Sequence, residues 1–208
     1  EVDGTLWRAM RVTNRPIDYG SLGYYVVSGL SGTMAAGLAA NGHVLAFRWG
    51  DATRLCVLHS ITLDGLAGSA TAFAAGFAKV DVILARTWTG NYTGGTALTP
   101  TGNAQKLRTS MGTSLVTDAR ISTTASLTAG GTPTLDTNPF GLISFSVGTV
   151  ANVIYQNQVK LFSTDGLYSH PVVFAANEGF VVRATVPATG TWQFGITVAW
   201  AEVASTGF

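Results

Sequence analysis

The sequence predicts an all-β protein: an antiparallel, jelly-roll-like β-sandwich with long loops rich in Gly and Thr. Apolar and polar residues alternate along many segments, which is typical of half-buried strands. Gly, Pro, Asn or Asp residues bound those segments, and evidence for helices is poor. Because 208 residues is an ordinary length for one all-β domain, we expect an N-terminal arm at residues 1–20 and a single β-sandwich domain at residues 21–208.

The first elements come from an uncharged segment, Tyr19 to Phe47. It is long enough to be considered as a membrane-spanning helix. Its many glycines and the turn signal Asn41-Gly42 instead favour strands at Tyr24–Leu30 and His43–Trp49 joined by a tight loop. We therefore expect no membrane partner.

Further strands follow from the same alternation. In Arg54–Asp64 the pattern places alternate residues on one face, namely Leu55, Val57, His59, Ile61 and Leu63. Phe77–Trp88 alternates in the same way. Shorter segments rich in β-branched or aromatic residues predict the remaining strands: Arg120–Ser126, Leu142–Val147, Val150–Phe162, Val172–Ala175 and Phe180–Val186.

The clearest strand is Thr191–Val203. One face carries large apolar residues, namely Trp192, Phe194, Ile196, Val198 and Trp200. The opposite face is small and uncharged, which suits a packed sheet or a subunit contact better than open water. The Ala-rich segments Met34–Ala40 and Ser69–Ala78 each allow a helical turn or two.

Long loops interrupt this pattern. Thr89–Thr96, Thr99–Asn103 and Thr128–Pro133 are rich in Gly, Thr, Asn and Pro, the residues of turns and loops. Strand patterns resume directly after each one, so we expect loops at one end of a single sandwich rather than domain boundaries.

The charge content indicates self-association. Only 11% of the residues are Asp, Glu, Lys or Arg, while 47% are apolar; a typical soluble domain has about 25% charged residues. So few charges cannot coat the surface of a free monomer, and we expect other copies to cover part of it. The candidate assembly contacts are Arg8, Arg11, Arg15, Trp192 and Trp200.

Arg8, Arg11 and Arg15 form the one local basic cluster. We interpret it as a solvated or subunit-bridging arm, because nucleic-acid binding needs many clustered phosphate contacts. No nucleic-acid partner is expected.

The sequence contains no convincing catalytic or cofactor-binding pattern. The three histidines lack metal-ligand spacing, no glycine-rich loop precedes a Lys-Ser or Lys-Thr pair, and Cys56 is interpreted as a small buried residue. We expect no enzyme activity and no cofactor. A hydrolase using Glu178 or Glu202 is the lowest-ranked alternative.

Aromatic residues supply a second candidate site. Trp88 and Tyr92, with Trp49 and Trp192 as further members, offer ring faces on which a sugar can stack. Ordinary core or subunit packing is the favoured interpretation, because three of the four lie in or beside predicted strands.

Two regions of the sequence resemble structural proteins of tailed bacteriophages. The first is Gly37–Trp49, and the second comprises Asn177–Arg183, Ala188–Trp192 and Val198–Val203. The resemblance covers under a quarter of the chain. It implies a capsid decoration (cement) protein or another virion shell component, and it carries over no catalytic residue.

We therefore expect a non-enzymatic protein of the virion capsid that self-associates and bridges capsid subunits. Its expected partners are its own copies, the major capsid protein and other virion proteins. The resemblance suggests a trimer, because cement proteins commonly sit on lattice threefold positions. Two alternatives stay open: a receptor- or carbohydrate-binding module on a virion or cell surface, and a self-assembling filament subunit.

Overall fold

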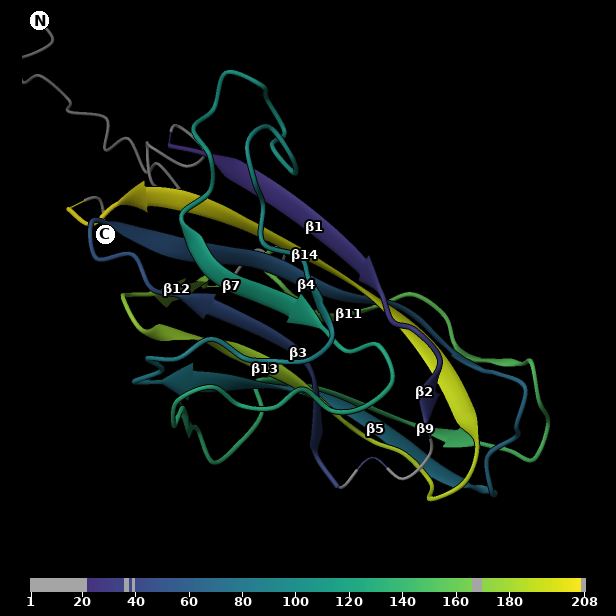
Figure 1. Cartoon of the computed structure of the whole chain (residues 1–208). Coiled ribbons are helices and arrows are strands. Elements are labelled where there is room, and N and C mark those ends of the chain that lie inside the picture. The colour runs from purple at the N-terminus through teal and green to yellow at the C-terminus, as the bar shows by residue number, and fades with distance from the viewer. Residues whose placement is uncertain (1–21, 36–37, 39, 166–169, 207–208) are drawn as a thin grey trace, which may run out of the picture.

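The computed structural model describes residues 22–35, 38, 40–165 and 170–206. Within these residues the regular structure consists of strands, which form two antiparallel sheets. Figure 1 shows the sheets as two layers, with β1, β14 and β4 in one and β3, β13 and β5 in the other. The predicted all-β class and antiparallel sandwich are confirmed. The predicted arm, residues 1–20, lies outside the described residues.

The first layer, sheet A, is built around two long strands. Neighbours follow the order β1-β14-β4, the second edge of β4 pairs in turn with β12, β11 and β10, and β2 pairs with β14. Its strands are β1 (Tyr24–Leu30), β2 (Met34–Ala35), β4 (Arg54–Gly68), β10 (Ile154–Gln156), β11 (Val159–Ser163), β12 (Val172–Phe174) and β14 (Thr191–Ala204).

The second layer, sheet B, follows the order β6-β7-β3-β13-β5, and β5 pairs along its second edge with β8 and β9. Its strands are β3 (Gly42–Trp49), β5 (Gly76–Arg86), β6 (Thr96–Ala97), β7 (Val116–Ile121), β8 (Thr134–Leu135), β9 (Gly141–Val147) and β13 (Glu178–Thr185).

Four of the pairings are nested in the sequence. β1 pairs with β14, β3 with β13, β4 with β11 and β5 with β9, so each pair encloses the next along the chain. The chain therefore behaves as one long antiparallel ribbon, and successive pairs of strands enter sheets A and B alternately. This winding places the apolar faces of both sheets against one another.

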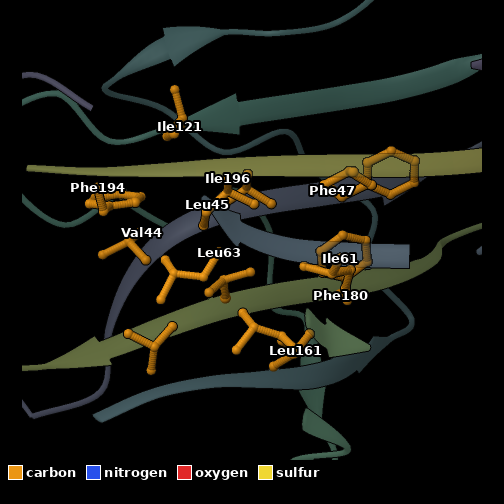
Figure 2. Packing of buried hydrophobic residues seen from close by; sticks show 14 of the residues in the cluster. Val44, Leu45, Phe47, Ile61, Leu63, Ile121, Leu161, Phe180, Phe194 and Ile196 are labelled. Atoms are coloured by element: carbon orange, nitrogen blue, oxygen red, sulfur yellow. The ribbon is translucent and has the colours of Figure 1, made fainter. Parts of the chain in front are cut away.

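The core fills the space between the layers (Figure 2). All five apolar residues predicted to share a face of β14 belong to it, and each is no more than 2% exposed. Figure 2 shows Ile196 beside Leu45 and Leu63, and Phe180 beside Ile61, with these neighbours drawn from different strands. Period-two alternation therefore predicted this face correctly.

The predicted face of β4 is wrong. The register between β4 and β14 shifts twice, and Asp64 and His59 are the extra residues on β4 at these β-bulges. Each extra residue reverses the alternation. Leu63 and Ile61 therefore lie in the core, whereas Val57 packs with Ala201 and Val203 on the opposite face of the sheet.

Some predicted boundaries also differ. The segment Val150–Phe162 forms two strands, β10 and β11, because they pair with β4 on either side of the bulge at Asp64. The strand expected at Arg120–Ser126 begins earlier and ends at Ile121. Met34 and Ala35 form β2 rather than a helical turn, and residues 69–75 form no helix.

A matched pair of leucines tests the packing. Leu63 is fully buried and Leu107 is 60% exposed. We predict that Leu63→Ala lowers the free energy of unfolding by about 3 kcal/mol through lost apolar contact and a residual cavity. Leu107→Ala should change it by less than about 0.5 kcal/mol. Urea unfolding measures both, and equal effects would contradict the assigned core.

Candidate functional site

Trp88 and Tyr92 do not form an exposed platform. Trp88 is 0% and Tyr92 is 1% exposed, and their ring centroids lie 4.8 Å apart. They belong to a second apolar cluster outside the main core, which also contains Ile83, Val181 and Leu127. Loop residues thus pack against the outer face of sheet B. The candidate sugar-stacking platform is therefore wrong, and the favoured interpretation of ordinary packing agrees with the burial of both residues.

Arg48 fixes the loop that carries these rings. The guanidinium is buried and donates to the carbonyl of Trp88 at 2.7 Å, to Asn91 Oδ1 at 2.6 Å and to Asn177 Oδ1 at 3.2 Å. The backbone N–H of Tyr92 donates to Asp118 Oδ2. Burial raises the pKa of Asp118, against the opposing effect of that hydrogen bond and of nearby arginines. Strand pairing does not supply hydrogen bonds to this loop. The buried guanidinium of Arg48 supplies them instead.

Glycine is required where the two loops meet. A Cβ atom on Gly130 would lie 1.6 Å from the carbonyl oxygen of Asn91, and one on Gly90 would lie 2.6 Å from the nitrogen of Gly131. Gly131 also has a φ of +67°, a conformation that favours glycine. The segments around Gly90 and Gly130 are therefore loops packed against each other, and glycine at these positions allows this close backbone approach.

A charged cluster lies beside this packed region. Asp81 is buried in β5, and its carboxylate accepts from Arg183 Nε at 2.7 Å and from Nη2 at 3.1 Å; Lys79 Nζ lies 2.8 Å from Asp81 Oδ2. Burial acts to raise the pKa of Asp81, but the hydrogen bonds from Arg183 and Lys79 outweigh it and lower the pKa. Asp81 is therefore an ionised, fully paired carboxylate.

His43 lies against Tyr92. Its Nδ1 is 2.8 Å from the Tyr92 hydroxyl, and the two rings stack with centroids 5.6 Å apart. Burial, followed by the charge of Arg183, lowers the pKa of His43, and burial raises the pKa of Tyr92 to about 12. Both groups are thus neutral near pH 7, and the contact is structural.

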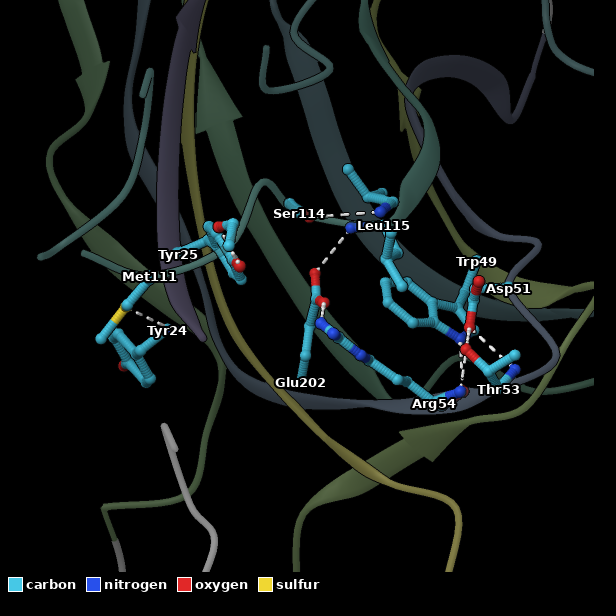
Figure 3. Close-up of polar contacts among 12 residues, drawn as sticks. Tyr24, Tyr25, Trp49, Asp51, Thr53, Arg54, Met111, Ser114, Leu115 and Glu202 are labelled. Atoms are coloured by element: carbon cyan, nitrogen blue, oxygen red, sulfur yellow. Dashed lines mark hydrogen bonds and ion pairs between the residues drawn. The ribbon is translucent and has the colours of Figure 1, made fainter. Parts of the chain in front are cut away.

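A third buried charge, Glu202, ties a long loop to sheet A (Figure 3). Its Oε1 accepts from the backbone N–H of Leu115 at 2.9 Å, and its Oε2 pairs with Arg54 Nη1 at 3.1 Å. Tyr25 donates to the carbonyl of Gly112 in the same loop. Burial raises the pKa of Glu202 despite these hydrogen bonds, and burial raises the pKa of Tyr25 to about 12.

Neither glutamate considered for hydrolysis has the setting of an acid–base pair. Glu178 Oε1 lies 2.8 Å from Arg86 Nη1, and its Oε2 accepts from the N–H of Ala175, whereas Glu202 is bound by Arg54. Each carboxylate is held by its own arginine. Paired catalysis instead needs two carboxyl groups flanking one bond, so this geometry favours structural roles.

Other reactive side chains also have structural surroundings. Cys56 is fully buried, and burial, with the nearby charge of Glu202, raises the pKa of its thiol well above the usual value; such a thiol is a poor nucleophile. His59 Nδ1 lies 2.7 Å from Thr164 Oγ1. Over the part of the chain that the structure describes, no group of three His, Cys, Asp or Glu residues is placed to hold a metal ion.

The candidate assembly residues divide into two groups. Trp192 and Trp200 are 0% exposed and lie in the core between the sheets. Their prediction as assembly contacts is therefore wrong: the alternation that identified an apolar face identified the inward face of β14. Arg8, Arg11 and Arg15 lie outside the described residues.

The other face of β14 forms the centre of an outer surface on sheet A that carries few charges, with Asp64 and Lys160 at its margin. Cross-strand rows run from Ser28 through Thr197 to Thr62, and from Leu30 through Gly195 to Gly65. The hydroxyls of Ser28 and Thr197 lie 2.7 Å apart. We call the surface formed by these six residues the outer face of sheet A. Its side chains are small or apolar, so a second protein surface can approach closely.

A groove of about 260 Å³ crosses this face. Leu30 and Ile154, which are 71% and 65% exposed, line it together with Gly65 and Gly195, which leave its floor without side chains. Among the described residues that line it, Asp64 is the one that carries a charge. Asp64 accepts hydrogen bonds from Thr197 and Gln158. Sequence reasoning identified the small face of β14 but missed the groove, because Leu30 and Ile154 come from strands distant in sequence.

Comparisons with protein-family models, with curated proteins and with solved structures find no match for this chain. Across the described residues, no helix is long and apolar enough to cross a membrane.

The burial of Trp88 gives a direct prediction. Trp88→Ala should lower the free energy of unfolding by about 3–5 kcal/mol, because it removes the largest side chain of the second cluster. Tyr92→Phe should cost only about 1 kcal/mol, the loss of one hydrogen bond to His43. Chemical denaturation followed by tryptophan fluorescence and circular dichroism measures both. A Trp88→Ala variant of unchanged stability would contradict the buried position.

Asp81 gives a pH-dependent prediction. At pH 7, Asp81→Asn should lower the free energy of unfolding by about 3 kcal/mol, because it leaves Arg183 without its buried partner. A lowered folded-state pKa stabilises the fold above the unfolded pKa and loses this contribution as pH falls. The difference between variant and wild type should therefore shrink below about pH 4. Urea unfolding between pH 2.5 and 7 measures this difference in the free energy of unfolding. A difference that does not change with pH would contradict the prediction.

Proposed function

We propose that this chain is a jelly roll that serves as a non-enzymatic structural protein of a tailed-phage virion. The nested pairing of β1 with β14, β3 with β13, β4 with β11 and β5 with β9 supports the jelly-roll assignment. Jelly rolls contain two Greek keys and recur in viral capsid and lectin domains. The phage resemblance of Gly37–Trp49 and of the C-terminal segments adds the virion setting.

The most specific role that we propose is capsid decoration. Copies associate with one another and bridge neighbouring capsid subunits, with the major capsid protein or other virion proteins as partners. The observation that carries this proposal is the outer face of sheet A, where small uncharged residues surround a groove lined by exposed Leu30 and Ile154. Such a surface loses little solvation when another protein covers it.

The mechanism is mechanical. A standard protein interface buries roughly 1,600 Å², and a decoration protein makes several smaller contacts at once. Contacts that are linked in one lattice act together, so the total binding free energy that holds the shell exceeds that of any single contact. The pairing of Glu178 and Glu202 with separate arginines supports a role without catalysis.

A carbohydrate-binding module is the second candidate. Lectin domains share the jelly roll, and the groove offers Asp64, Gln156 and Gln193 as hydrogen-bonding groups beside the apolar Leu30 and Ile154. In this case the sugar occupies the groove rather than Trp88 and Tyr92, which are buried.

Particle incorporation tests the proposal. Phage particles formed with the wild-type chain should contain it, as measured by mass spectrometry of gradient-purified virions. A Ser28→Lys and Thr62→Lys double variant should be depleted from particles several-fold, because it places two charges on the outer face of sheet A. Thr117→Lys, at an exposed position of β7, is the matched control and should be incorporated normally.

Absence of the wild-type chain from purified virions would overturn the virion assignment. Equal incorporation of all three forms would overturn the role of the outer face of sheet A. Specific binding on a glycan array that the Ser28→Lys and Thr62→Lys changes abolish would favour the carbohydrate-binding candidate.

A further inference from the structure

Strand β9 forms one edge of sheet B, and one of its two sides is unpaired in the described part of the chain. β9 pairs with β5 over all seven of its residues, from Gly141 to Val147, without a register shift. Within the described residues, no strand pairs with its other side and no backbone hydrogen bond reaches it there. Every second residue of β9 therefore directs an N–H and a C=O group away from the sheet.

This edge lacks the features that normally prevent strand pairing. Its sequence, Gly-Leu-Ile-Ser-Phe-Ser-Val, contains no charge and no proline, and edge strands are usually protected by charges, proline or bulges. The edges of sheet A differ. The backbone of β1 bonds to Gln105 and Leu107, and β11 carries Lys160 and a register shift.

Apolar side chains surround the free edge. Phe77 of β5 and Leu142 of β9 are 74% and 58% exposed. Ile143 and Phe145 of β9 pack against the core but remain partly exposed. A half-covered inward face is expected where a sheet stops short of the strand that would complete it.

We propose that β9 pairs antiparallel with β9 of a second copy of this chain, about a two-fold axis at Ser144. This register aligns Ile143 with Phe145 of the other copy, and does so twice, so both partly exposed inward residues gain an apolar neighbour. It aligns Leu142 with Ser146 and each Ser144 with its counterpart, and it opposes no like charges. Main-chain hydrogen bonds across the axis join two copies of sheet B into one continuous sheet.

A second copy fits this edge because the pairing closes on itself. A two-fold contact uses the same edge of both copies and leaves no free strand for further growth. The inference rests on the self-association in the proposed function and specifies its contact. Larger multiples, such as the trimer expected from the resemblance, would need another surface.

Charge substitutions at Ser144 test the contact in the purified full-length chain. Light scattering and sedimentation velocity over a dilution series should show that wild type forms a dimer. Ser144→Lys should raise the dimer dissociation constant by about fivefold or more, because two like charges then face each other across the axis. Ser144→Asp should do the same. An equimolar mixture of the two variants should restore association, because opposite charges then meet.

Thr117→Lys is the control. Thr117 lies in β7, near the edge of sheet B that is opposite to β9, so this variant should dimerise as wild type does. Unchanged circular dichroism and urea unfolding establish that the Ser144 variants are folded. Failure of the mixture to restore a dimer, or dimers unaffected by Ser144→Lys, would overturn the β9 contact. A wild-type trimer unaffected by Ser144→Lys would overturn it while retaining self-association. A wild-type chain that stays monomeric at all concentrations would overturn both the β9 contact and self-association. Virion incorporation tests the proposed function separately.

Discussion

The antiparallel pairing of β14 with β4 is the constraint on which the rest of the molecule depends. It spans Trp192 to Ala204, and β14 also pairs with β1 on its other side. The inward face of β14 supplies large core residues, while its outward face presents Gly195 and Thr197. One strand therefore contributes both to the hydrophobic core and to the sparsely charged surface that we propose as an interface.

Several of the few charged residues are buried and have structural roles. Arg48, Asp81, Asp118 and Glu202 are buried, and each forms hydrogen bonds or ion pairs that hold loops or strands together. These residues contribute almost nothing to surface charge. The exterior therefore carries fewer charges than the sequence contains, and the self-association expected from the low charge content still applies.

Sequence reasoning succeeded where one strand determines the pattern and failed where distant segments meet. The face of β14 follows from alternation alone, because its own residues show no extra insertion. The face of β4 did not, because the bulges at His59 and Asp64 arise only when β14 is its partner. The sequence could favour packing for Trp88 and Tyr92 but could not identify their neighbours, since Leu127, which packs in the same cluster, lies far along the chain. The groove between Leu30 and Ile154 likewise exists only after folding.

The central claim is that copies of this chain cover part of its weakly charged surface. Amide hydrogen exchange, measured by mass spectrometry at low and high protein concentration, tests it most directly. The account predicts that exchange slows with concentration in residues 141–147, while the already paired central strands, such as β13, change little. Exchange that is independent of concentration along the entire chain would contradict it.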